Sequence, residues 1–216
     1  SADIMQSLAQ LYVTGKQDWS TDSECVPTVR TEHAIATLLD AYRQGISIPN
    51  LDEAWAGMVR EAERMPLKTP DQCLEASVDY WALGQLAQET GREDEALWWT
   101  QRGEQVFDSV WTKEFMIIDS TYTRMRGNGL YQGTRWQYRW GAPMYLKRME
   151  QLVGSKVLLA QLEQFFQEGL YNQGNEPDIH VPFLFGRLGA PEKTAPVVRS
   201  LATEAITHRY GGNDAY

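Results

Sequence analysis

The chain has 216 residues, of which 43% are hydrophobic and 23% charged, and its formal net charge at pH 7 is −9. This length can bury a sizeable core, and the composition is typical of a globular domain. The negative charge argues against nucleic acid or an anionic membrane as the main partner, and no apolar run is long enough to span a bilayer.

Apolar residues recur at helical spacing along most of the chain, from Ile4 onward. Thr31 is a plausible N-cap, Gly45 a plausible residue after a helix C-terminus, and Asp52 a plausible cap of the next helix. A very short turn near Gly91 should make the helices on either side antiparallel neighbours. The predicted helices span residues 3–13, 31–45, 52–65, 73–90, 93–111, 143–152, 155–169, 177–187 and 193–207.

Residues 116–132 interrupt this helical pattern. The pair Ile117 and Ile118 and the cluster 127–129 (Gly-Asn-Gly) indicate irregular or extended chain. No segment is rich enough in strand signals to build a sheet of its own. The sequence therefore predicts an all-α fold of helical hairpins that form part of a toroid, with a solenoid of helix pairs as the structural alternative.

Residues 171–177 (Tyr-Asn-Gln-Gly-Asn-Glu-Pro) place an amide and a carboxylate ahead of an apolar segment. Pro177 fits the first turn of a helix. In one interpretation Asn175 caps that helix and Glu176 favours its positive end. In the other, the oxygens of both side chains and a backbone carbonyl are ligands for Ca²⁺.

Residues 131–140 combine aromatic rings with polar side chains, a chemistry suited to binding sugars. One interpretation places Gln132 and Trp136 at the mouth of a cleft. The other is an aromatic helix start that packs into a core, with Gln132 in solvent. No nucleophile motif, phosphate loop or dinucleotide fingerprint is present.

The three histidines, His33, His180 and His208, have no metal-binding spacing to one another. A lone histidine on a helix is commonly a hydrogen-bonded scaffold residue, although His33, beside Glu32, is also suited to orienting a substrate hydroxyl. The two cysteines, Cys25 and Cys73, form either one disulfide or two independent thiols.

Residues 171–185 (YNQGNEPDIHVPFLF) resemble the Gly-Asn-Glu-Pro-Ser-His-x-Ile-Pro-Tyr-Leu-Tyr signature of glycoside hydrolase family 92, whose members are calcium-dependent, inverting exo-α-mannosidases. Residues 33–46, 80–87 and 136–140 are similar to further segments of the family, in the same order along nearly the whole chain. The resemblance implies an (α/α)6 toroid that packs against an N-terminal β-sandwich domain. The chain is then expected to be most of the catalytic helical domain of a longer, secreted or extracytoplasmic enzyme.

The resemblance also implies roles for individual residues. Asn175, Glu176 and Gln173 would lie at a Ca²⁺ ion that binds two hydroxyls of mannose. The sugar itself would contact three side chains, those of His33, Trp136 and His180.

Gln132 departs from the family pattern, because it occupies the position of the glutamic acid that serves as general acid. An amide cannot deliver a proton, so the leaving group should be one that needs none, such as a phosphate. The expected substrate is therefore mannose-α-1-phospho-6-mannose on a mannose-containing glycan. An ordinary α-1,2-mannosidase and a non-catalytic sugar-binding relic are the alternatives. Asp214 is a candidate for the general-base motif, but the preferred interpretation places that motif beyond Tyr216.

Overall fold

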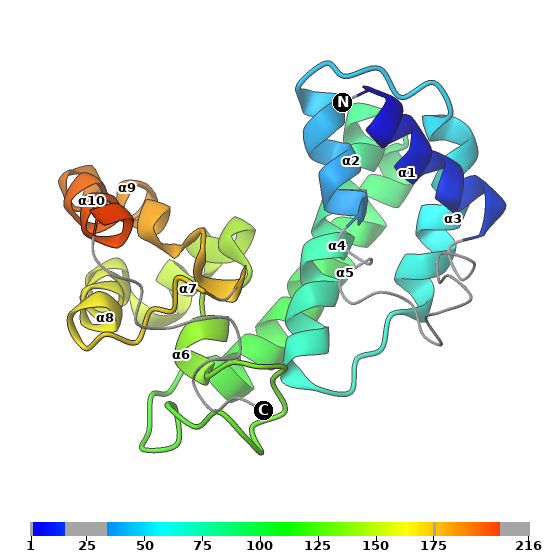
Figure 1. Ribbon diagram of the computed structural model, residues 1–216. Coiled ribbons are helices and arrows are strands. Elements are labelled where there is room, and N and C mark those ends of the chain that lie inside the picture. The colour runs from blue at the N-terminus through cyan, green and yellow to red at the C-terminus, as the bar shows by residue number, and fades with distance from the viewer. Residues whose placement is uncertain (1, 16–33, 175, 204–216) are drawn as a thin grey trace, which may run out of the picture. The chain divides into compact units, whose positions relative to one another are not determined.

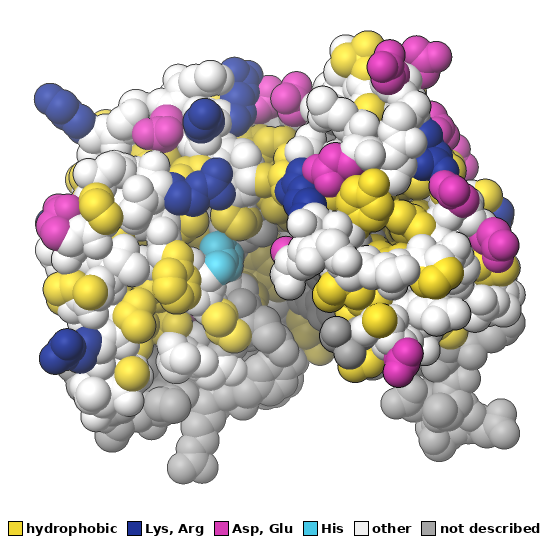
Figure 2. Space-filling view, turned by 90° about the horizontal axis from the view of Figure 1, so that it is seen from above, with side chains coloured by type: hydrophobic (Ala, Val, Ile, Leu, Met, Phe, Trp, Pro, Cys, Tyr) yellow, Lys and Arg dark blue, Asp and Glu magenta, His cyan; other side chains and the backbone are white. Residues whose placement is uncertain are grey.

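The computed structural model describes residues 2–15, 34–174 and 176–203. Within these ranges the regular structure is helical and no strand is present, as the sequence predicts (Figure 1). The same residues contain no helix that is long and apolar enough to cross a membrane. Charged side chains of both signs are dispersed over the face seen in Figure 2, with hydrophobic side chains between them. The chain forms two compact units, a first unit of residues 1–68 and 75–106 and a second unit of residues 69–74 and 107–216.

The first unit is built from long, regular helices whose apolar faces meet. Gly57 allows a close approach to the first helix, because a Cβ atom there would lie 2.1 Å from the carbonyl oxygen of Tyr12. Gly84 does the same for the helical pair around Gly91, since its Cβ would lie 2.7 Å from Thr100 Oγ1. That pair lies side by side, as predicted (Figure 1). The helices that contribute to this unit are α1 (Ala2–Thr14), α2 (Ala34–Arg43), α3 (Leu51–Arg64), α4 (Pro70–Glu89) and α5 (Glu93–Val110).

Two predicted helix boundaries in the first unit can be compared with the structure. Gly45 ends α2 with a left-handed φ of 72°, and Ile46 N donates to Ala41 O at 3.0 Å, which confirms the predicted C-terminus. The N-cap of α3 is Asn50, so the prediction of Asp52 was wrong. Asp52 lies in the first turn instead, where its Oδ1 accepts a hydrogen bond from Arg92 Nη2 at 2.5 Å. Thr31 lies outside the described residues.

The second unit consists of shorter pieces joined by turns. The predicted helix over residues 177–187 is divided into two 3₁₀ turns and one short α-helix. Pro182 explains part of this division, because it has no N–H with which to continue a helix. The pieces of the second unit are the π-helical turn η3 (Trp111–Phe115), α6 (Arg135–Tyr138), η4 (Pro143–Tyr145), α7 (Leu146–Val153), α8 (Ser155–Gln167), η5 (Glu176–Asp178), η6 (Val181–Phe183), α9 (Leu184–Arg187), η7 (Pro191–Lys193) and α10 (Thr194–Thr203).

Arg139, at the end of α6, holds several of these pieces together although it is fully buried. Its guanidinium donates to the carbonyl of Phe115, to the hydroxyl of Tyr122 at 3.2 Å and to Gln161 Oε1. Tyr122 in turn donates to the same Phe115 carbonyl at 2.5 Å. A buried cation is tolerated only with such partners, so this hub fixes α6 relative to η3 and α8.

Candidate active site

The loop before α6 holds Gln132 in an unusual backbone conformation. Among the described residues, Gln132 is the only one other than glycine with a left-handed φ, at 53°. Such a conformation costs about 1–3 kcal/mol and is kept where the surroundings enforce it. The following Gly133 packs closely against Tyr138, because a Cβ there would lie 2.5 Å from the Tyr138 ring, and the Tyr138 hydroxyl donates to Tyr131 O at 2.6 Å.

Two polar side chains fix the rest of this loop. Asp71 Oδ2 accepts from Tyr131 N at 2.8 Å. Asn128 Nδ2 donates to Gly133 O at 2.9 Å, while its Oδ1 accepts from Leu130 N at 3.0 Å. The segment around Gln132 is thus irregular, as predicted, and each of its neighbours is tied to a side chain.

α6 begins with a capping box that the sequence analysis did not identify. Thr134 Oγ1 accepts from Gln137 N at 3.3 Å, and Gln137 Oε1 accepts from Thr134 N at 2.8 Å. The pattern Thr-x-x-Gln at residues 134–137 is a recognised signal for this arrangement and would have located Gln137. The capping box therefore fixes the orientation of the Gln137 side-chain amide, including its nitrogen Nε2.

Gln137 connects α6 to the segment that follows residue 171. Its Nε2 donates to Asp178 Oδ2 at 3.1 Å, and the same oxygen accepts from Asn172 N at 2.6 Å. Asn172 Oδ1 accepts from Gly174 N at 3.0 Å. All three polar side chains, those of Gln137, Asn172 and Asp178, are buried. The two segments that the sequence analysis singled out are thus joined through one buried carboxylate.

Asp178 is the unexpected residue of the site. Burial raises its pKa to about 7, against the lowering effect of its hydrogen bonds from Asn172 and Gln137. Its Oδ1 atom is buried and has no hydrogen-bond partner. An oxygen of this kind, within two residues of the Glu176 backbone, fits the hard oxygen-ligand chemistry of Ca²⁺. Helical periodicity in the sequence could not identify Asp178 as buried, because it lies in the single 3₁₀ turn η5, which is too short to show a periodic pattern.

His180 joins the same two segments at a second point. Its Nε2 lies 2.7 Å from the carbonyl oxygen of Trp140. A carbonyl only accepts, so Nε2 carries a proton, and in the neutral ring Nδ1 is then the acceptor nitrogen. Burial lowers the pKa of His180, which also favours the neutral ring. The predicted sugar contact of His180 stays a prediction.

Trp136 lies in an aromatic cluster, and its side chain is only 3% exposed. Its ring meets Tyr122 edge to face at a centroid distance of 5.3 Å, and Phe165 lies 6.2 Å away. The core interpretation of Trp136 therefore describes its packing in this structure. Its role as a sugar contact stays a prediction.

Of the predicted calcium ligands, Gln173 lies in the turn before η5 and the backbone of Glu176 lies at the start of η5. Gln173 is exposed, and its Oε1 accepts a hydrogen bond from the Tyr171 hydroxyl. Glu176 opens η5, but its side chain and Asn175 lie outside the described residues, as do His33 and Asp214. Within the described part of the chain, no three His, Cys, Asp or Glu side chains form a group that would hold a metal ion.

Cys73 is a free, partly buried thiol. Burial raises its pKa, and the nearby carboxylate of Asp71 raises it further. The reactive thiolate is therefore disfavoured. Cys25 lies outside the described residues.

Comparison with known proteins shows where this arrangement belongs. A solved structure, described as that of the GH92 family glycosyl hydrolase CcMan5, matches 94% of this chain with a TM-score of 0.75 and 22% sequence identity. At this identity the likeness shows the fold, which is the all-helical arrangement predicted for part of an (α/α)6 toroid. The chain spans about a third (32%) of the length of that structure. No curated protein matches the chain.

The model of the glycosyl hydrolase family 92 catalytic domain matches residues 68–214. This range contains Gln132, the capping box of α6 and the buried carboxylate of Asp178. It covers more than half of the chain, and the chain therefore belongs to glycosyl hydrolase family 92.

Proposed function

We propose that the chain is the helical part of an inverting, calcium-dependent glycosidase that removes terminal α-mannose from a mannosyl phosphodiester. Family membership supports the glycosidase class. The junction at Asp178 carries the proposal, because it ties the segment of Gln132 to the candidate calcium turn. The leaving-group oxygen and the two hydroxyls bound by calcium would belong to neighbouring atoms of one sugar, so a direct tie between the two segments supports their action on the same ring.

The calcium ion would be held by Asn175, Glu176 and an oxygen of Gln173. The unpartnered Oδ1 of Asp178 would be a further candidate ligand. When bound, the ion supplies a fixed positive charge and a template for two hydroxyls of the sugar. The protein residues orient this turn, since Asn172 and Asp178 fix its backbone on both sides.

The side chain at position 132 determines which leaving group can depart. Loss of a general acid costs about 10²–10⁴-fold in rate when the leaving group is a sugar alkoxide. A phosphate leaves as a stable anion, and an amide can donate a hydrogen bond to it where a carboxylate would repel it. Gln132 therefore favours mannose-α-1-phospho-6-mannose, with mannose and an uncovered mannose-6-phosphate on an N-glycan as products.

The remaining parts of the proposal concern the whole enzyme. Water would attack the anomeric carbon from the face opposite the leaving group, with a general base at Asp214 or beyond Tyr216. The N-terminal β-sandwich domain of the family would complete the site. Mannose-bearing glycans are external molecules, so we expect secretion or an extracytoplasmic location.

The test compares two substrates in the full-length protein. The wild type should hydrolyse a mannosyl phosphodiester and leave α-1,2-mannobiose nearly untouched. Gln132→Glu should gain activity on α-1,2-mannobiose, by up to about 10²–10⁴-fold, because it restores the proton donor. A calcium chelator should abolish both activities, and added calcium should restore them.

Gln88→Glu is the matched control, since it makes the same chemical change on an exposed position of α4. It should leave both rates unchanged. If Gln132→Glu leaves α-1,2-mannobiose unused, or if the wild type already hydrolyses it well, the leaving-group explanation is wrong. Binding of mannose without hydrolysis of either substrate would favour the sugar-binding relic.

A further inference from the structure

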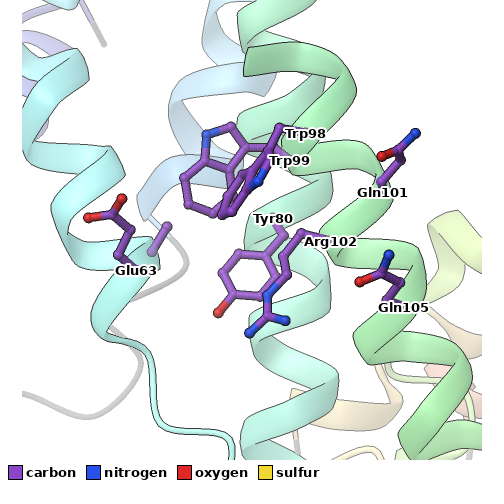
Figure 3. A pocket seen from close by; sticks show the side chains of 8 residues that line it. Glu63, Tyr80, Trp98, Trp99, Gln101, Arg102 and Gln105 are labelled. Atoms are coloured by element: carbon purple, nitrogen blue, oxygen red, sulfur yellow. The ribbon is translucent and has the colours of Figure 1, made fainter. Parts of the chain in front are cut away.

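A pocket of about 390 Å³ lies in the first unit, and the residues of the candidate active site do not line it. Its walls come from α3, α4 and α5 (Figure 3). Glu63 of α3 lies on one side, and the rings of Tyr80 on α4 and Trp98 on α5 lie on the other. A volume of this size is in the range of small-molecule sites in proteins.

Trp98 is the most unusual lining residue, because its large apolar side chain is 52% exposed. It is nevertheless held in place. The rings of Trp98 and Trp99 meet edge to face at a centroid distance of 4.3 Å and an angle of 89°, and Trp99 is buried. An indole that is fixed on a buried neighbour and still open to solvent is a preformed stacking surface.

The polar side chains that line the pocket include one cation, one anion and amides. The guanidinium of Arg102 lies 5.9 Å from the centre of the Tyr80 ring, which holds it within the pocket wall. Arg102 offers donors only, the carboxylate of Glu63 offers acceptors only, and the amide of Gln105 offers both. One cation and one anion leave the pocket without a dominant charge.

We propose that this pocket is a second glycan-binding site, which takes a neutral hexopyranose ring. One face of such a ring carries C–H groups and suits the face of Trp98, while its rim carries hydroxyls that both donate and accept. An anionic ligand would meet Glu63, a cationic one would meet Arg102, and a wholly apolar one would leave both charges unpaired. That the ring is mannose rests on the proposed function, whereas the pocket chemistry requires only a neutral pyranose.

The experiment is affinity electrophoresis of the full-length protein through gels that contain neutral yeast-type mannan. Trp98→Ala should weaken the retardation by about tenfold or more, as expected for a central aromatic anchor. Leu97→Ala is the control, because Leu97 is the preceding residue on α5, is 61% exposed and does not line the pocket. It should migrate like the wild type. Glu63→Gln, which keeps the shape and removes the anion, should weaken retardation less than Trp98→Ala.

Each outcome decides the proposal. Equal retardation of Trp98→Ala and Leu97→Ala would overturn it, and so would binding of a uniformly anionic polysaccharide that is as strong as binding of mannan. Hydrolysis of a small soluble mannosyl phosphodiester should be the same in both variants, since neither residue belongs to the candidate active site. The wild type could fail to hydrolyse a mannosyl phosphodiester or any other mannoside while Trp98→Ala is still less retarded by mannan than the wild type. In that case the proposed function is wrong and the second glycan-binding site is supported.

Discussion

Among the described residues, the first unit consists of long helices that bury few polar side chains. The second unit consists of shorter helices that bury more of them. Among buried polar or charged residues, Asn50, Ser77 and Asp79 belong to the first unit. The second unit holds Asp71, Gln137, Arg139, Asn172 and Asp178. Burial of a polar group costs free energy unless it is hydrogen-bonded, so the second unit depends on the hydrogen bonds that its buried polar side chains make. That arrangement lies where the family's chemistry is expected, and the three predictions below test the contrast.

Arg139 should give the largest effect, because the second unit depends on it. Arg139→Ala would remove three hydrogen bonds and the contacts of the guanidinium with Trp111 and Trp140, whose rings lie at 4.8 and 5.5 Å. It would leave the buried Phe115 carbonyl with one donor fewer and open a cavity. We expect the free energy of unfolding in urea to fall by about 3–5 kcal/mol.

Arg148→Ala is the control for this change, since Arg148 is partly exposed and pairs with Asp108 at 2.8 Å. It should cost no more than about 1 kcal/mol. If both arginine variants lose equally little, the buried hub does not support the second unit.

Gly57 tests the first unit, where helix approach and not hydrogen bonding is expected to matter. Gly57→Ala would place its Cβ 2.1 Å from the backbone oxygen of Tyr12, so α1 and α3 must separate. We expect a loss of about 1–3 kcal/mol in thermal or urea unfolding. Gly186→Ala, in α9, meets no atom within 4 Å and should instead be neutral or stabilise by about 0.5–1 kcal/mol. Equal effects at the two glycines would contradict the close approach.

Asp178 tests the polar interior through pH, in the presence of a chelator. Its pKa is raised from 3.8 to about 7 by burial, so between these values the native protein binds more protons than the unfolded chain. The free energy of unfolding should be highest below pH 4 from this cause, and fall as the pH rises to about 7, by up to about 1.4 kcal/mol per pH unit. Asp178→Asn should flatten the curve in that range.

Asp119→Asn supplies the comparison for the pH experiment. Asp119 is exposed, and its pKa is lowered because its carboxylate accepts hydrogen bonds from the side chain and backbone of Thr121. This variant should retain the wild-type decline between pH 4 and 7. If the free energy of unfolding of Asp178→Asn falls between pH 4 and 7 as much as that of the wild type, ionisation of Asp178 is not the cause of the decline.

Prediction from the sequence succeeded where a local rule applies. The helices of the first unit follow from apolar periodicity over many residues, and Gly45 ends α2 because glycine alone adopts its φ of 72° easily. It failed at the cap of α3 and over residues 177–187, where Pro182 and short turns outweigh periodicity. The capping box at Thr134 was readable from its spacing and was overlooked.

The candidate site was found only in part, since motif resemblance located its two segments but not what joins them. Gln137 comes from one of these segments and Asn172 and Asp178 from the other, and nothing in the spacing of 41 residues between Gln137 and Asp178 predicts their hydrogen bond. The left-handed φ of Gln132, which residues other than glycine rarely adopt, was likewise not predictable from the motif that located this residue.

The sequence by itself determined the all-helical class, the irregular segment before α6 and the membership in glycosyl hydrolase family 92. These depend on local periodicity, on turn-forming residues and on motif order, all of which are properties of the chain in one dimension. Tertiary structure alone decided that Asp178 is buried with one unpartnered oxygen and that Trp98 stays exposed in a pocket that Arg102 and Glu63 also line. Burial and the pairing of charges depend on which distant residues meet, and that is settled only when the chain packs.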